Sequence, residues 1–476
     1  MGRKFLSYNA IMNNNDSLTL YPTIFVIFGI TGDLASRKLL PALLSLYSKR
    51  LLPIRFTVIG FSRRSFNKEE FRDLIRNKMN IRPGQFKEED IKHFLDHMSY
   101  EQGYFDDSRA YERLSKRIQS IDHEWDQCSN KIFHLSVPPS FYAGILTNLS
   151  SSKLNHTCND ESGWTRILIE KPFGSDIKEA KALDNLLGKL FDEKQIFRID
   201  HYLAKEALQN ILAFRFSNSL FESVWNNRSI SRVHIKLFEK IGIEGRGDLY
   251  ESLGALKDMG QNHMLAMLAL ITMDRPKSFI AGNIRDERAK VLSTLSTISP
   301  RNLERFVSRG QYDGYLAEKG VASNSRVETY FRIEARLNNK NWKGVPFYLE
   351  NGKAMRETKT EIDVYFKGSK NIEEQNILTF RIQPEECIKI RFFVKTPGFA
   401  WEREAKTLKF KYSDIPSFTS LPNDYERLIH DAFIGDQTLF ASTDEIMASW
   451  KFVTPIIENW NRLPLKKYPK GAIEVE

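Results

Sequence analysis

Residues 23–60 read TIFVIFGITGDLASRKLLPALLSLYSKRLLPIRFTVIG, and this stretch decides the fold of the N-terminal part. It opens with a short apolar run rich in β-branched and aromatic residues, continues with leucines at helical spacing, and closes with a second β-rich run, RFTVIG. This order predicts a strand, a helix and a second strand, the βαβ unit of a parallel sheet.

The same alternation continues to about residue 200. Amphipathic helices are predicted over 66–79, 87–98 and 108–121, and strands over 131–137 and 165–173. We therefore expect an α/β first domain over 22–200, a Rossmann-like doubly wound parallel sheet, preceded by a disordered tail over 1–21.

The pattern changes after residue 200. Short runs of alternating polar and apolar residues indicate a large antiparallel sheet with one covered face, over 232–242, 327–339, 345–353, 360–368, 377–384 and 388–396. Helices are predicted over 252–273 and 444–460. Residues 201–476 are therefore expected to form a second, α+β domain.

Composition and charge exclude several classes of protein. The 476 residues are 41% hydrophobic and 27% charged, as in folded globular proteins, and no apolar run approaches the roughly 18 residues of a membrane span. The net charge of +10 would suit an anionic partner, but basic and acidic residues are interleaved, so we expect no nucleic acid. Three cysteines without metal-ligand spacing favour a reducing, cytoplasmic location and no metal.

The turn after the first predicted strand has the spacing of a nucleotide-binding loop. Glycines allow the backbone to approach a pyrophosphate, and the next helix offers free N–H groups. The expected coenzyme-binding residues are Gly29, Thr31, Gly32, Asp33 and Leu34. The second strand ends in Ser62, Arg63 and Arg64, where an NAD enzyme usually has an acid, so Arg63 favours the 2′-phosphate of NADP. A structural glycine pair and a solvated basic turn are the alternatives.

Two polar strings carry the candidate chemistry. RIDHYLAKE, residues 198–206, places Asp200, His201, Tyr202 and Lys205 near the expected domain boundary, although a polar helix start has a similar composition. DMGQNH, residues 258–263, opens an apolar helix, where a histidine is commonly a core residue. On an α-helix Asp258 and His263 would lie about 140° apart, so their spacing alone assigns no shared site.

These strings resemble the glucose-6-phosphate dehydrogenase family, in the order of that family and over about residues 22–468. The matching stretches are GITGDLASRKLLPAL, the arginine of GFSRR, HLSVPP, IEKPFG, RIDHYLAKE, EGRGDLYESLGALKDMGQNH, NWKGVPFYLENGK and TEI. The resemblance implies oxidation of glucose 6-phosphate at C1 to 6-phosphogluconolactone with hydride transfer to NADP⁺, the first step of the oxidative pentose phosphate pathway. It also implies a substrate-binding and oligomerisation role for the second domain, in a homodimer or homotetramer.

The resemblance assigns a role to each matching residue. It implies that His263 is the general base and that Asp200 orients it. His201, Tyr202 and Lys205 would hold the phosphate, and Arg63 the 2′-phosphate of the coenzyme. The remaining sugar contacts would be Lys38, Lys171, Glu239, Asp258 and Lys353, and Lys171 would also contact the coenzyme.

Three departures from the family pattern fall near the expected sugar pocket: Ala204 in place of glycine, GRGDLYES, and ENGK. A dehydrogenase for another aldose phosphate and a catalytically silent regulatory relative are therefore alternatives. Retention of His263, Asp200 and Lys205 together argues against a silent relative.

Overall fold

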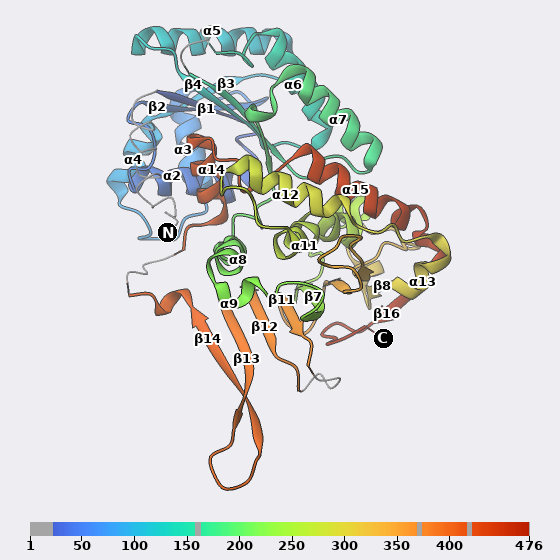
Figure 1. The fold of residues 1–476 in the computed structure, drawn as a ribbon. Helices are drawn as coiled ribbons and strands as arrows, with labels where there is room; N and C mark the ends of the chain where they lie inside the picture. Colours follow the sequence, from blue (N-terminus) through green and yellow to red (C-terminus); the bar gives the residue numbers. More distant parts are fainter. Residues whose placement is uncertain (1–21, 158–162, 369–373, 417–420, 476) are drawn as a thin grey trace. The chain divides into compact units, whose positions relative to one another are not determined.

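A computed structural model describes residues 22–157, 163–368, 374–416 and 421–475, so the tail expected over 1–21 lies outside the described part. Contacts divide the chain into two compact units (Figure 1). The first unit comprises Met1–Gly174, Lys178–His201 and Pro422–Ala441, and the second comprises Ser175–Ile177, Tyr202–Leu421 and Ser442–Glu476.

The first unit is built on a seven-stranded sheet of order β15-β6-β5-β4-β1-β2-β3. Its strands are β1 (Thr23–Phe28), β2 (Phe56–Ser62), β3 (Met98–Gln102), β4 (Asn130–Leu135), β5 (Thr165–Glu170), β6 (Ile196–Ile199) and β15 (Phe440–Ala441). All pairs are parallel except β15 with β6. Every residue of β1 is buried, as a strand covered on both faces requires.

Helices cover both faces of this sheet, so the predicted doubly wound fold is confirmed. They are η1 (Ala35–Leu39), α2 (Leu40–Ser48), α3 (Lys68–Lys78), α4 (Glu88–Asp96), α5 (Ser108–Trp125), α6 (Tyr142–Ser151), α7 (Ile177–Leu190) and α14 (Asp424–Ile434). In Figure 1, α5 and α6 lie on one face and α2, α3 and α4 on the other. Local sequence sets the helix starts: Asn67 and Glu70 form a capping box at α3.

The segment 422–441 belongs to the first unit, although the sequence pattern placed it with the second domain. Phe440 pairs with Ile199 at the sheet edge. The Arg166 guanidinium lies 3.5 Å from the centre of the Trp164 ring and donates to the carbonyls of Ala432 and Phe433 at 2.6 and 2.8 Å. A half-buried arginine thus satisfies two carbonyls near the C-terminus of α14.

The second unit contains a nine-stranded sheet of order β14-β13-β12-β11-β7-β10-β9-β8-β16. Its strands are β7 (Ile230–Phe238), β8 (Val307–Tyr312), β9 (Tyr330–Ala335), β10 (Phe347–Gly352), β11 (Lys359–Phe366), β12 (Ile377–Gln383), β13 (Cys387–Lys395), β14 (Arg403–Lys411) and β16 (Leu465–Tyr468). The sheet is mostly antiparallel, as predicted, but β10 pairs with β7, and β16 with β8, in parallel.

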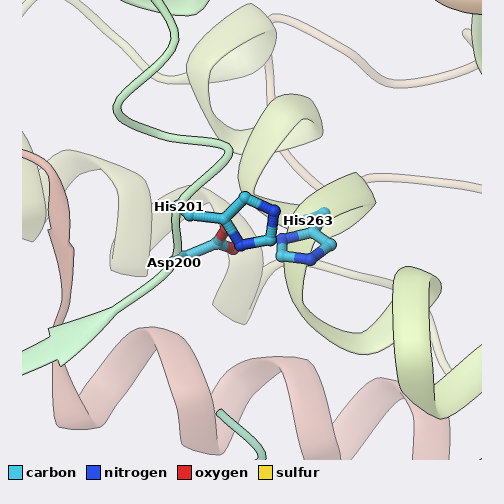
Figure 2. Close-up of side chains that lie close together, drawn as sticks. All are labelled: Asp200, His201 and His263. Atoms are coloured by element: carbon cyan, nitrogen blue, oxygen red, sulfur yellow. The ribbon is translucent and has the colours of Figure 1, made fainter. Parts of the chain in front are cut away.

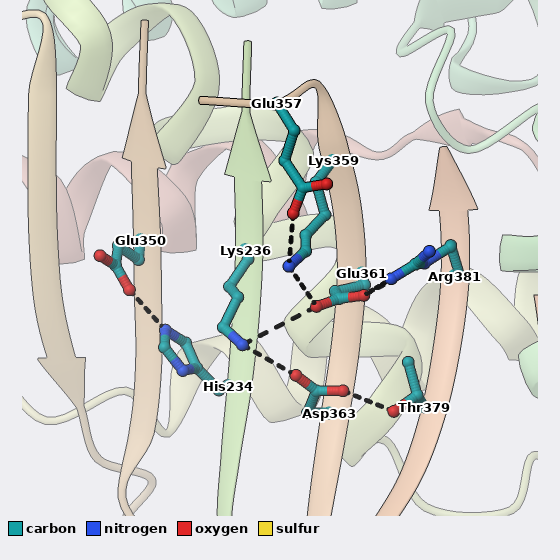
Figure 3. Close-up of polar contacts among 9 residues, drawn as sticks. All are labelled: His234, Lys236, Glu350, Glu357, Lys359, Glu361, Asp363, Thr379 and Arg381. Atoms are coloured by element: carbon teal, nitrogen blue, oxygen red, sulfur yellow. Dashed lines mark hydrogen bonds and ion pairs between the residues drawn. The ribbon is translucent and has the colours of Figure 1, made fainter. Parts of the chain in front are cut away.

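The two faces of this sheet differ in chemistry because side chains alternate along each strand. On β7, Ile235 and Leu237 are buried among apolar neighbours. His234 and Lys236 point to the opposite face, where they contact carboxylates of neighbouring strands (Figure 3). Burial would raise the pKa of Glu350, but the hydrogen bond and charge of His234 hold it below its ordinary value. Carboxylates on this face are therefore paired with basic side chains of neighbouring strands.

The helical elements of the second unit are mostly short. They include α8 (Glu206–Ser217), α9 (Ser219–Glu222), α10 (Gly247–Ala255), η4 (Leu256–Met264), α11 (Leu265–Thr272), α12 (Ala281–Ser293), α13 (Leu303–Phe306), α15 (Thr443–Glu458) and η9 (Trp460–Arg462). The helix predicted over 252–273 is divided, because Gly254 is not helical and η4 is wound as a π-helix. Within the described ranges, no helix is both long and apolar enough to cross a membrane. Cys128 is disulfide-bonded, and Cys387 is free and buried.

Candidate functional site

The first unit has a pocket of about 420 Å³ at the carboxyl ends of β1, β2 and β4. The chain runs outward from β1 to β2 and β3 and then crosses to β4 on the other side of β1. This reversal of strand order is where open α/β sheets bind ligands. The lining residues are Gly29, Thr31, Gly32, Ser62, Arg63, Gly103, Tyr104, Phe105, Asp106, Ser136, Val137, Pro138 and Phe141.

Position 29 requires glycine for two reasons, its backbone conformation and the lack of room for a side chain. Its φ is +81°, and a Cβ atom there would lie 2.3 Å from the Ser136 carbonyl oxygen. The Gly29 N–H donates to the Phe61 carbonyl at 2.9 Å, which closes the loop over the end of β2. The following helix begins at Asp33, so its first N–H groups lie beside this loop.

Hydrogen bonds to backbone carbonyls hold the basic turn after β2, and the side chains of Arg63 and Arg64 are exposed. Tyr100 donates to the carbonyls of Ser62 and Arg64, and Gln102 donates to that of Arg63. The Arg63 side chain has no ion pair among the described residues. The geometry thus leaves its guanidinium available beside the pocket.

Not every residue expected to bind the coenzyme lines this pocket. Asp33 forms an exposed ion pair with Arg37 at 2.7 Å, and Leu34 belongs to the first turn of the helix. Lys171 directly follows β5 and is half-buried. Lys38 is exposed on η1. None of these four residues lines the pocket, so their expected roles in binding remain predictions.

Asp200 and His201 follow the end of β6, whereas His263 lies on η4 (Figure 2). Within the first unit the His201 ring stacks on Tyr425 of α14, with centroids 6.4 Å apart. Tyr425 donates to Glu170 Oε2 at 3.2 Å, and His134 Nε2 lies 3.3 Å from Glu170 Oε1. Burial, followed by the charge of Glu170, raises the pKa of Tyr425, so its hydroxyl stays protonated.

The second unit brings together three other predicted residues. The rings of Tyr202 and His263 lie 4.2 Å apart, and Lys205 Nζ lies 5.5 Å from the centre of the Tyr202 ring. His263 is fully buried. The imidazole of His263 and the amine of Lys205 thus both lie close to the phenol ring of Tyr202.

The π-helical winding of η4 changes the relation between Asp258 and His263. Its hydrogen bonds include one from the Leu265 N–H to the Gly260 carbonyl, five residues earlier. Residues five apart therefore lie close to the same face, and Asp258 and His263 are five apart. The separation of about 140° expected from α-helical geometry was wrong, because that geometry assumes 3.6 residues per turn.

Glu239, Asp258 and Lys353 form a third group of predicted residues that the structure brings together. Glu239 follows β7 and Lys353 follows β10, and because these strands are parallel the two residues emerge side by side. Lys353 Nζ pairs with Glu239 and lies 3.9 Å from Asp258 Oδ2. Its side chain is almost fully buried, so both carboxylates offset the cost of burying an ammonium.

Sequence reasoning missed the residues that support His201, namely His134, Glu170 and Tyr425. His134 and Glu170 stand within the recognised stretches HLSVPP and IEKPFG. A histidine and a glutamate inside otherwise apolar predicted strands were the available signal, since buried charged residues need partners.

The fold and these groups define an oxidoreductase class: a nucleotide-binding Rossmann unit followed by a β+α unit with clustered polar side chains. Comparisons with known proteins agree. A model of the glucose-6-phosphate dehydrogenase NAD-binding domain matches residues 26–210, and one of the glucose-6-phosphate dehydrogenase C-terminal domain matches 212–475. The chain belongs to the glucose-6-phosphate dehydrogenase family. The match to an NAD-binding domain supports a pyridine nucleotide as the cofactor.

The similarity to individual relatives extends over nearly the whole chain. Glucose-6-phosphate 1-dehydrogenase of Chlamydia pneumoniae is 38% identical, covering 96% of this chain and 94% of the relative. The enzyme of Aggregatibacter actinomycetemcomitans is 41% identical, covering 91% of this chain and 90% of the relative. A solved structure of glucose-6-phosphate dehydrogenase in complex with its substrate glucose-6-phosphate has a TM-score of 0.89 and 34% identity, covering 96% of each chain.

We predict that Gly29→Ala weakens coenzyme binding about tenfold or more, because the new Cβ would displace the loop from the Ser136 carbonyl. The backbone strain of a positive φ adds a stability cost of roughly 1–2 kcal/mol. Gly84→Ala is the matched control, since Gly84 also has a positive φ of +75° but nothing within 4 Å of an added Cβ. Calorimetric coenzyme titration of both variants provides the measurement. Equal affinities in the two variants would contradict the prediction.

Proposed function

We propose that this chain oxidises glucose 6-phosphate at C1 to 6-phosphogluconolactone with NADP⁺ as the hydride acceptor. The observation that carries the proposal is the buried His263 imidazole packed against Tyr202, with Lys205 on the same ring. A base for a sugar hydroxyl and donors for a phosphate are thus provided by neighbouring side chains. Formation of NADPH from glucose 6-phosphate, followed by absorbance, tests the proposal.

His263 would accept the C1 hydroxyl proton, since imidazole titrates near neutral pH. Asp200 would orient its ring and stabilise the imidazolium. The support for this pairing is the family resemblance, in which the stretches RIDHYLAKE and KDMGQNH match together.

The sugar would be held by two sets of groups. His201, Tyr202 and Lys205 would bind the phosphate, since a dianion can accept from an imidazole, a phenol and an ammonium together. Glu239, Asp258 and Lys353 would bind the sugar hydroxyls, with Lys38 and Lys171 as further contacts. The pairing of Lys353 with two carboxylates supports this assignment because it places donors and acceptors in a fixed arrangement.

Coenzyme contacts would come from the loop after β1 and the turn after β2. Gly29, Thr31, Gly32, Asp33 and Leu34 would face the pyrophosphate, and Lys171 would reach the coenzyme from the end of β5. Arg63 would bind the 2′-phosphate that distinguishes NADP from NAD. When bound, the coenzyme supplies the nicotinamide that accepts the hydride.

Arg63→Ala should narrow or reverse the preference for NADP⁺ by weakening its binding about ten- to a hundredfold. A charge-assisted contact of this kind contributes roughly 1.5–3 kcal/mol. Steady-state kinetics with NADP⁺ and NAD⁺ measures the effect, and the NAD⁺ rate is the internal control. A wild-type protein that uses both coenzymes equally would refute this assignment.

His263→Asn should keep binding of coenzyme and sugar while lowering kcat by about 10² or more, because a general base acts mainly on the transition state. His93→Asn is a suitable control, since His93 is exposed on α4. Asp200→Asn should also be slow, with a displaced pH profile of kcat/KM. Near-normal kcat in His263→Asn would exclude this histidine as the base.

Lys205→Ala should strongly impair oxidation of glucose 6-phosphate and leave any weak oxidation of glucose nearly unchanged. Phosphate binding energy can also align C1, so the loss should affect kcat as well as KM. Steady-state rates of the wild type and the variant on both sugars suffice. An equal reduction for both sugars would place Lys205 at the sugar ring or in the fold instead.

We also propose a homodimer or homotetramer in the cytoplasm, as the family resemblance implies. Large exposed aromatic residues support an interface: Phe399 and Trp401 lie in the loop that connects β13 to β14, and Trp401 is 82% exposed. Tryptophan at a surface is typical of interaction sites. Light scattering after gel filtration measures the assembly state, and cell fractionation the location.

A further inference from the structure

Glu328 accepts hydrogen bonds from the backbone at the junction between α10 and the π-helical η4. Gly254 interrupts the helix with a φ of +66°, and a Cβ there would lie 2.6 Å from Glu328 Oε1. The Ala255 N–H donates to the Glu328 carbonyl at 3.1 Å, and the Leu256 N–H donates to Glu328 Oε1 at 3.0 Å. One residue thus satisfies the first two N–H groups after the kink.

The second carboxylate oxygen of Glu328 is held by a tryptophan. The indole Nε1 of Trp460, in η9, donates to Oε2 at 2.7 Å. Both carboxylate oxygens are therefore engaged, and the glutamate is buried. Burial raises the pKa of Glu328, while the Leu256 and Trp460 hydrogen bonds and the charge of Arg309 oppose that shift. The carboxyl has little freedom to rotate.

Thr329, the next residue along the chain, is hydrogen-bonded to the backbone of Lys353. The Lys353 N–H donates to the Thr329 carbonyl at 2.9 Å, and Tyr468 donates to the Lys353 carbonyl at 2.8 Å. Glu328 and Thr329 thus connect two elements of the proposed sugar site. One is η4, which carries Asp258 and His263, and the other is the end of β10.

We infer that Glu328 is a positioning residue that fixes η4, and with it His263 and Asp258, relative to Lys353. The inference rests on the proposed function of these three residues. Glu328 itself contacts none of the reacting groups. Its removal should allow the start of η4 to shift while Thr329 continues to hold Lys353. Of the proposed sugar contacts only Asp258 would move, while Lys353 and Glu239 stay in place, so kcat should fall by a larger factor than the KM for sugar phosphate rises.

The sharpest test removes a single hydrogen bond. Trp460→Phe keeps an aromatic ring but deletes the donor to Glu328 Oε2. Trp450→Phe is the matched control, because Trp450 is buried on α15 and its Nε1 has no hydrogen-bond partner among the residues that the structure describes. Glu328→Gln is the second variant, since an amide can accept only one of the two bonds and would direct an N–H group toward the other donor.

Two readouts separate positioning from stability. Relative to Trp450→Phe, we expect Trp460→Phe to lower kcat about three- to tenfold with the KM for glucose 6-phosphate changed less than twofold, and Glu328→Gln to lower kcat further. Hydrogen exchange should accelerate in the peptide covering 255–264 and remain unchanged in the first unit. Thermal melts and coenzyme titration give the folded fraction to which each rate is normalised.

Each outcome decides a different question. A wild type that does not oxidise glucose 6-phosphate would refute the proposed function, and the exchange rates of 255–264, which need no substrate, would still test the positioning role. Unchanged exchange in this peptide would overturn the inference. Equal normalised kcat in Trp460→Phe and Trp450→Phe would also overturn it, as would equal factors of loss in kcat and KM.

Discussion

The parallel pairing of β10 with β7 is the constraint on which the polar groups of the second unit depend. It places Glu239 beside Lys353, because each residue directly follows its own strand. The Glu239 N–H donates to the Gly352 carbonyl at 2.9 Å, which continues the ladder to that point. An antiparallel pairing would have sent the two residues to opposite ends of the sheet. The ion pair of Lys353 with Glu239 follows from this direction.

The sequence was sufficient for the βαβ start of the first unit because its signals there are local and mutually consistent. The β-rich run, the glycine turn and the leucine-rich helix each indicate the same βαβ unit, and the structure places Gly29, Gly32 and Arg63 around one pocket. Capping residues such as Asn67 also lie within the predicted boundaries. The resemblance to a known family then assigned roles that no local pattern contains.

The remaining features depend on contacts between residues distant in the sequence. The parallel pairings of β10 and β16 leave no periodic signal, and the strand β14 is so exposed and charged that alternation is weak. The return of 422–441 to the first unit depends on Arg166, about 266 residues away. The π-helical winding of η4 was also beyond prediction, because α and π helices share the same composition and differ in their hydrogen bonds.

The second unit uses charge in two different ways. On the face of the large sheet, Lys236 and Asp363 pair across neighbouring strands and hold the sheet together (Figure 3). The Lys353 side chain is more deeply buried, at 3% exposed against 18% for Lys236, but its carboxylate partners remain about one-quarter exposed. Glu239 and Asp258 can therefore compensate the ammonium and still accept from a ligand. A buried cation with partly open partners is organised before a ligand arrives, which reduces the cost of ordering these side chains on binding.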